Sequence, residues 1–280
     1  MSIKTMPVWK WALLLLASFA LSFVMYALAQ TALGAVRIHW VGCLISVALA
    51  TGMIALYALF VKLFEKHAPE DIPLGRFAAD CLKGLGIGFG FFVVVVLFMY
   101  ALGLYHIDGF ITENCSGILL SFLVFLMVAT GEEILFRGVL FRWIDEKWGF
   151  PAALIVSSVL FGLMHIFQPE ATWWSTLAIA IEAGLLLGAA YKFSGTLWLP
   201  IGIHWAWNFT QGNIFGFAVS GGEAGASLIR STVTGPDILT GGAFGAEASL
   251  EVVVIGLILS VIFIFRCKSA GKCSGEGRRS

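Results

Sequence analysis

The sequence predicts an all-α membrane protein: a polytopic bundle of about eight transmembrane helices with both termini in the cytoplasm. The chain of 280 residues is 59% hydrophobic and 12% charged, whereas a soluble domain has about 25% charged residues. Its apolar runs reach the roughly 17–25 residues that a helix needs to cross a bilayer. Its cations gather on alternate connections between these runs, which sets the orientation of a membrane protein.

Eight apolar runs meet the length requirement, at about residues 9–30, 38–63, 83–104, 116–137, 151–168, 174–193, 197–217 and 250–266. The fourth is expected to continue as a helix to about residue 146, beyond the lipid. The first run, with Lys4 and Lys10 before it and an A-x-A site at residues 27–29, resembles a secretory signal. Its apolar region is longer than most signals have, so we expect residues 1–29 to be retained.

The Lys and Arg residues are divided very unequally between the two sides. Of 17 in the chain, only Arg37 and Arg230 fall on the side opposite to the termini. Cytoplasmic connections carry the excess of cations, which predicts an integral multi-pass protein, expected in the plasma membrane. The net charge is zero and the charges lie at membrane edges, so we expect lipid contact and no nucleic-acid binding.

We divide the chain into four parts. Residues 1–110 form an N-terminal three-helix region without motifs, and residues 111–217 form a helical core that carries the polar motifs. Residues 218–249 are rich in glycine and are expected to form an outward loop, mobile or loosely packed. Residues 250–280 are the last transmembrane helix and a basic cytoplasmic tail. The five cysteines show no pairing pattern, so no structural disulfide or thiolate metal site is expected.

Two adjacent carboxylates, Glu132 and Glu133, follow the fourth apolar run. An ionisable residue at membrane depth is costly, which makes it a candidate for function. Glu133 and Arg137 are four residues apart, a favourable spacing for an ion pair on one helix. Glu132 points about 100° away from that pair, so it is expected to face a cavity and to serve as a general base.

His165, four residues after Phe161, is expected at the level of Glu132. A polar turn near Trp148 separates the two helices, with Glu132 16 residues before it and His165 17 residues after it. At 1.5 Å per residue, both lie about 24 Å from the turn of a helical hairpin. A histidine on an apolar helix is often only a packed core residue, but its depth favours a functional role.

The seventh run adds His204 and Asn208, which share one helix face. They are expected either to join helices by hydrogen bonds or to meet Glu132 and His165 in a cavity open to the cytoplasm. Glu182 is a third intramembrane carboxylate. It is expected either to orient one of the histidines or to be an unrelated buried group.

Two chemical arrangements fit these side chains. In one, Glu132 and His165 activate a water molecule while His204 and Asn208 donate hydrogen bonds to the oxyanion of a peptide carbonyl. In the other, Glu132, His165 and His204 bind zinc and leave one position open. The residues alone leave both arrangements open, although no HExxH motif is present.

The ordered motifs EExxxR, FxxxH and HxxxN resemble those of the CPBP family, the CAAX-protease and bacteriocin-processing (Abi) intramembrane endopeptidases. They read here as Glu132, Glu133 and Arg137, then Phe161 and His165, then His204 and Asn208. The resemblance implies a glutamate-type endopeptidase, with Glu132, His165, His204 and Asn208 catalytic and Glu133, Arg137, Phe161 and Glu182 supporting. We favour no cofactor, with zinc as the alternative, and expect a membrane-associated protein or peptide as substrate.

Two other functions remain open. The resemblance also allows a noncatalytic membrane immunity or regulatory scaffold protein of the same fold, because a fold alone does not fix a function. A proton-coupled transporter would use Glu132, Glu182 and the histidines as a relay. The sequence shows no internal repeat of the kind that many secondary transporters have, which disfavours the transporter.

Overall fold

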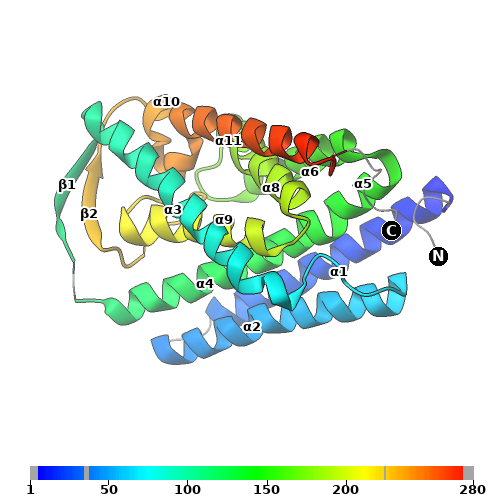
Figure 1. Ribbon diagram of the computed structural model, residues 1–280. Coiled ribbons are helices and arrows are strands. Elements are labelled where there is room, and N and C mark those ends of the chain that lie inside the picture. Colours follow the sequence, from blue (N-terminus) through cyan, green and yellow to red (C-terminus); the bar gives the residue numbers. More distant parts are fainter. Residues whose placement is uncertain (1–5, 35–37, 112, 224, 274–280) are drawn as a thin grey trace.

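The structure is a computed structural model that describes residues 6–34, 38–111, 113–223 and 225–273 (Figure 1). Lys4, Arg37 and the end of the basic tail, which entered the charge analysis, lie outside the described residues. The protein is 77% helical, so the predicted all-α polytopic membrane bundle is confirmed.

The principal helices are α1 (Val8–Gly34), α2 (His39–Phe60), α3 (Phe77–Ala101), α4 (Cys115–Glu133), α6 (Phe150–Met164), α9 (Trp198–Phe209) and α11 (Leu250–Ser269). Shorter helices are α5 (Arg142–Trp148), α7 (Trp173–Ile179), α8 (Leu185–Ser194) and α10 (Asp237–Thr240). Wider π-helical turns form η1 (Val61–Glu65), η3 (Ile134–Phe141), η5 (Ala180–Gly184) and η6 (Thr210–Ile214), and tighter 3-10 turns form η2 (Leu74–Arg76), η4 (His165–Phe167), η7 (Gly242–Phe244) and η8 (Ala246–Ala248).

Seven helical segments within the described residues are long and apolar enough to span a membrane. They match seven of the eight predicted runs, and the fourth extends through η3 and α5 to Trp148 as expected. The eighth prediction, residues 197–217, corresponds to the 12-residue α9 and the five-residue η6. This segment is shorter than the others, and all of α9 except Phe209 is buried within the protein.

The start of α1 and the end of α11 lie on the same side of the bundle (Figure 1). Trp11 of α1 packs against Trp148 at the α5–α6 turn, with ring centroids 4.5 Å apart. Lys272, just after α11, donates to the carbonyl of Phe193 at the end of α8 (3.0 Å). Chain ends on the same side of the bundle are what an even number of membrane crossings requires. That this side faces the cytoplasm stays a prediction.

Glycines bring α3 and α9 into backbone contact. A Cβ placed on Gly88 would lie 2.3 Å from the carbonyl oxygen of Ile203, and one on Gly202 would lie 2.5 Å from that of Cys81. Small residues allow membrane helices to approach this closely. The contact fixes α9, and with it His204 and Asn208, in the centre of the bundle.

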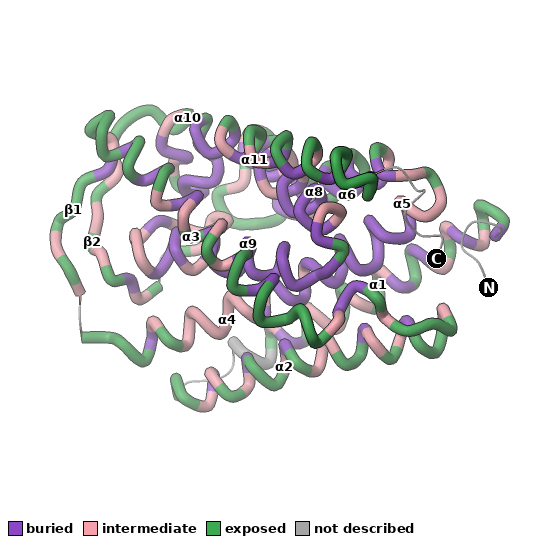
Figure 2. Tube along the Cα trace, viewed as in Figure 1, coloured by how far each residue is buried: buried purple, intermediate pink, exposed green. Residues whose placement is uncertain are grey.

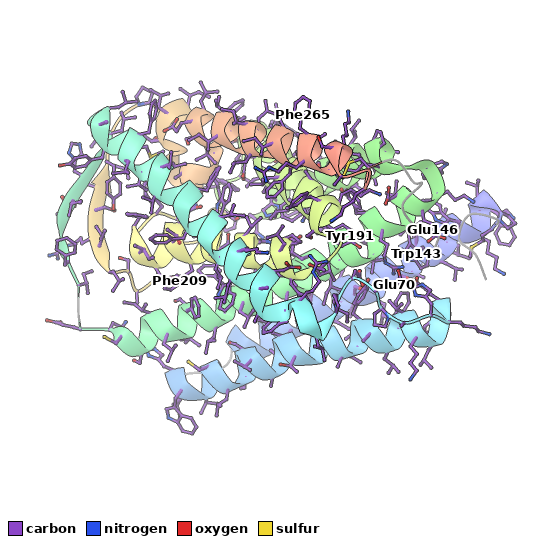
Figure 3. All side chains as sticks on the ribbon, viewed as in Figure 1. Glu70, Trp143, Glu146, Tyr191, Phe209 and Phe265 are labelled. Carbon is purple, nitrogen blue, oxygen red and sulfur yellow. A yellow bond between two sulfur atoms is a disulfide. The ribbon has the colours of Figure 1, made fainter. Side chains whose placement is uncertain are left out.

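Figure 2 shows the buried segments gathered along α8 and α9, while α2 and α11 present exposed stretches to the outside. Phe265 of α11 points away from the protein and is 65% exposed, whereas Tyr191 of α8 points inward and is 5% exposed (Figure 3). Large apolar side chains on an outer surface suit contact with lipid. The polar side chains of the candidate site are therefore enclosed by helices.

The Gly-rich segment differs from its prediction. It contributes β2 (Ile229–Val233), which pairs antiparallel with β1 (Tyr105–Phe110) at the end of the bundle opposite the described chain ends (Figure 1). No strand was predicted from the sequence. The expectation of loose packing is wrong for residues 244 and 246–249, all buried. Gly245, at φ 120°, takes a backbone conformation that other residues rarely adopt and lets this stretch fold inward.

The expectation that no cysteines pair is also wrong. Cys267 and Cys273 form a disulfide. The chain turns back after α11 at Gly271, whose φ is 68°, and the amide of Lys272 donates to the carbonyl of Cys267 (3.0 Å). This turn brings the two Cα atoms to 5.5 Å, a separation that a disulfide can bridge.

Candidate active site

The predicted ion pair between Glu133 and Arg137 is present at the centre of the protein. Nη1 of Arg137 lies 2.9 Å from Oε1 of Glu133, and both side chains are fully buried. Nη2 of Arg137 donates to the carbonyls of Ala183 (3.3 Å) and Gly184 (3.2 Å) in η5. A buried charge is tolerated when it is paired and hydrogen-bonded in this way. The pair also ties the end of α4 to η5.

π-helical turns accompany the polar residues. Glu133 is the last residue of α4 and η3 follows it; η5 contains Glu182, and η6 contains Gln211 two residues after the end of α9. Single π-helical turns inside α-helices often occur at functional sites. The sequence patterns predicted continuous helices here and did not reveal these turns.

His204 lies between the two adjacent carboxylates. Its Nδ1 is 2.9 Å from Oε1 of Glu133, and its Nε2 is 3.8 Å from Oε2 of Glu132. A carboxylate oxygen only accepts hydrogen bonds, so Nδ1 carries a proton and donates it in a hydrogen bond to Glu133. The other ring nitrogen, Nε2, faces Glu132. Glu133 therefore does more than pair with Arg137: it also orients the imidazole of His204.

Glu132 has a partner that the sequence analysis did not identify. The hydroxyl of Tyr26, in α1, donates to Oε1 of Glu132 (3.0 Å), and Gln30 donates to that hydroxyl (2.8 Å). Oε2 of Glu132 has no hydrogen-bond partner among the described residues. The carboxylate is thus held on one oxygen and available on the other. Tyr26 is the one tyrosine of the first apolar run, a signal that could have drawn attention to it.

His165 lies directly after α6, as the first residue of η4. Its Nδ1 donates to the carbonyl of Phe161 (2.8 Å), which leaves Nε2 available. The ring of Phe161 is 4.9 Å from that of His165 and 6.1 Å from that of His204. The guanidinium of Arg137 lies 4.6 Å from the centre of the same ring. Phe161 therefore packs against Arg137 and both histidines.

A small internal cavity adjoins the histidines. Its volume is about 20 Å³, close to the minimum that holds one water molecule. His165, His204 and Asn208 line it together with Glu182 and Glu247. Glu132 is not part of this lining, so this cavity brings together three of the four candidate catalytic residues. Glu132 instead meets the group through Nε2 of His204.

Glu182 and Glu247 add two buried carboxyl groups to this cavity. Neither oxygen of Glu182 has a partner within the described part of the chain, so no hydrogen bond to a histidine supports the orienting role considered for it. Oε1 of Glu247 accepts from the amide of Ser220 (2.6 Å). Burial raises the pKa of Glu247 to about 7. Glu247 was missed because the Gly-rich segment was expected to lie outside the packed core.

A zinc site of Glu132, His165 and His204 was the alternative arrangement. Among the residues that the structure describes, no group of three histidine, cysteine, aspartate or glutamate side chains is arranged to hold a metal ion. Glu133 and the carbonyl of Phe161 each contact Nδ1 of one imidazole, which leaves the Nε2 atoms of His204 and His165 available. The zinc arrangement therefore stays an alternative, which treatment with a chelator separates from the metal-free reaction.

Residues 114–210 match a family model described as type II CAAX prenyl endopeptidase, Rce1-like. The predicted resemblance is confirmed. The Rce1-like segment, as we call residues 114–210, begins at the residue that caps α4 and ends just after α9, so it contains all three motifs. Tyr26 and Glu247, which touch the site from α1 and from η8, lie outside it. The chain matches neither a curated protein nor a solved structure.

Proposed function

We propose that the protein is an intramembrane endopeptidase that hydrolyses a peptide bond without a metal. One relationship carries the proposal: the unpartnered Oε2 of Glu132 faces Nε2 of His204, while Glu133 fixes the other side of that ring. A carboxylate with one available oxygen can act as a general base. The similarity of the Rce1-like segment to CAAX prenyl endopeptidases supports the same reaction class.

In the proposed reaction, Glu132 takes a proton from water with His165 as the second hydrogen-bonding partner of that water. The water oxygen then bonds to the peptide carbonyl carbon. The resulting oxyanion accepts hydrogen bonds from the amide of Asn208 and from Nε2 of His204 when both nitrogens of that ring carry protons. The C–N bond breaks, and the proton held by Glu132 passes to the leaving amine.

An apolar groove supports a lipid-modified substrate. The groove has a volume of about 210 Å³ and is lined by residues of α1, α2, η1, the end of α4 and η3. Tyr26, Met53 and Gly131 form part of its wall, so it reaches the residue that holds Glu132. Its lining suits an apolar chain, and a prenyl group attached to a peptide has that chemistry. From the charge distribution we also propose that the site faces the cytoplasm, in the plasma membrane.

Cleavage by the purified full-length protein in liposomes tests the proposal. The probe is a farnesylated peptide with a C-terminal CAAX sequence, labelled so that cleavage releases fluorescence. We expect cleavage by the wild type and a loss of at least 100-fold in Glu132→Gln and in His165→Gln, since acid–base groups contribute about 10²–10⁴ in rate. Glu70→Gln, at an exposed carboxylate (Figure 3), is the control and should keep full activity.

Three outcomes would contradict the proposal. Equal cleavage by the wild type and both variants would remove Glu132 and His165 from the reaction. Loss of activity with a chelator, with recovery on added zinc, would replace the metal-free reaction by the zinc alternative. Absence of cleavage, combined with full genetic complementation by Glu132→Gln, would establish a noncatalytic scaffold.

A further inference from the structure

A second cavity lies at the edge of the bundle, away from the candidate active site. It has a volume of about 400 Å³ and is bordered by the start of α3, the end of α8, α9 and α11. Three cations line it: Arg76, Lys83 and Lys272. Lys272 comes from the turn after α11 that the Cys267–Cys273 disulfide closes. The cations thus come from parts of the chain far apart in sequence.

The charges of this cavity do not balance. Nη2 of Arg76 pairs with Oδ2 of Asp80 (2.8 Å), and Thr196 donates to the same carboxylate (2.9 Å). This pair is neutral. Lys272 uses one donor on the carbonyl of Phe193 (3.0 Å), and an ammonium group has three. Within the described residues no hydrogen bond or ion pair involves Lys83, so two positive charges face the cavity without an anion.

The remaining wall of the cavity is apolar and open. Ile87, Leu199 and Phe263 line it, and Gly86 adds no side chain: a Cβ built on Gly86 would meet no atom within 4 Å. Lys83 and Ile87 are four residues apart on one face of α3, and Arg76 lies just before the start of that helix, in η2. The cationic part of the cavity therefore lies at the N-terminal end of α3, and its apolar part extends toward the middle of that helix.

We propose that this cavity binds an anionic phospholipid, with its phosphate between Lys83 and Lys272 and an acyl chain along Ile87 and Phe263. A basic pocket between membrane helices, next to an apolar wall, is the form that sites for anionic lipid headgroups take. The two unbalanced charges match a headgroup with a net negative charge. Free phosphate would satisfy the lysines but leave the apolar wall without a partner.

Native mass spectrometry of the full-length protein in detergent tests the site, with dioleoylphosphatidylglycerol and dioleoylphosphatidylcholine as probes of equal chain length. We expect the wild type to retain phosphatidylglycerol in preference to phosphatidylcholine. The affinity of the double variant Lys83→Gln/Lys272→Gln for phosphatidylglycerol should fall about 30-fold, because each lysine near a lipid surface contributes about 1 kcal/mol. Lys62→Gln/Lys66→Gln, exposed after α2, removes the same charge elsewhere and should lose less than threefold.

A steric variant provides a second, charge-independent test. Gly86→Leu fills the cavity and should also weaken phosphatidylglycerol binding about tenfold, whereas Gly90→Leu, one turn further along α3 with equally open surroundings, should not. The proposal is overturned if the two lipids bind equally, if the two lysine pairs behave alike, or if Gly86→Leu has no effect. Displacement of the lipid by millimolar inorganic phosphate would instead make the site an anion site without lipid preference.

Discussion

Glu133, rather than its neighbour Glu132, holds the imidazole of His204: Oε1 of Glu133 lies 2.9 Å from Nδ1, while Oε2 of Glu132 lies 3.8 Å from Nε2. The two carboxylates are adjacent in sequence, yet they contact opposite sides of one ring. Their roles are therefore separate. Glu133, paired also with Arg137, is structural and positioning, and Glu132 is the proposed base.

Replacement of Glu133 tests its structural role. Glu133→Gln leaves the fully buried guanidinium of Arg137 without its counter-charge, and breaking one partner of a buried pair costs about 3–5 kcal/mol. Unfolding of the purified protein in detergent by denaturant should show this loss. Glu132→Gln should stay within about 1 kcal/mol of wild type, as most substitutions outside such pairs do. Equal destabilisation by the two variants would contradict the division of roles.

Tyr26 is expected to position Glu132. Tyr26→Phe removes the hydroxyl that donates to Oε1 of Glu132 and leaves the ring in place. A hydrogen bond to a charged group contributes about 1.5–3 kcal/mol, so kcat/KM should fall about tenfold or more while the protein stays folded. Steady-state cleavage of the farnesylated probe measures this, with Tyr100→Phe, an exposed tyrosine on α3, as the control. Unchanged kcat/KM in Tyr26→Phe would exclude a positioning role.

Asn208 is predicted to act on the oxyanion. Removing one such donor typically costs about 10²–10³ in kcat, so Asn208→Ala should lower kcat by this amount and leave KM nearly unchanged. The side chain lines the small cavity beside His204. A variant that raised KM and left kcat intact would indicate that Asn208 binds the ground state of the substrate rather than the transition state.

The buried carboxyl group of Glu247 is expected to make the stability of the protein depend on pH. Burial raises its pKa from 4.5 to about 7 in the folded protein. The unfolded chain therefore releases this proton at lower pH than the folded protein, so the contribution of Glu247 to stability is greatest below about pH 4.5 and is lost as pH rises to about 7. The full loss from this group is up to ~3 kcal/mol. Denaturant unfolding between pH 5 and 8 should show a flatter pH profile for Glu247→Gln than for wild type. Equal slopes for the two proteins would contradict the prediction.

The sequence was sufficient for most of the helices that carry the motifs and for one contact between motif residues. The apolar runs predicted the helices, and the four-residue spacing of Glu133 and Arg137 predicted their ion pair. These predictions succeeded because they depend on local geometry within regular helices. The short α9, buried except for Phe209, was counted as an ordinary span because apolar composition does not distinguish burial in lipid from burial in protein.

Contacts between distant segments were not predictable from the same patterns. Tyr26 reaches Glu132 across 106 positions, and Glu247 enters the cavity from a segment whose glycines suggested a loose loop. Glycine with positive φ, as at Gly245, permits tight inward folding as well as mobility, and composition alone does not separate the two. The Cys267–Cys273 pair likewise depended on a turn after α11 that no spacing rule indicated.

The most direct test of the account is a comparison of protein termini in membranes of cells that carry wild type, Glu132→Gln or no copy of the protein, with equal membrane levels of the two proteins. The account predicts new carboxyl termini on membrane-associated proteins with wild type alone. These termini would also identify the substrate. The same termini with wild type and Glu132→Gln would contradict the central claim that Glu132 carries out peptide hydrolysis in this membrane protein.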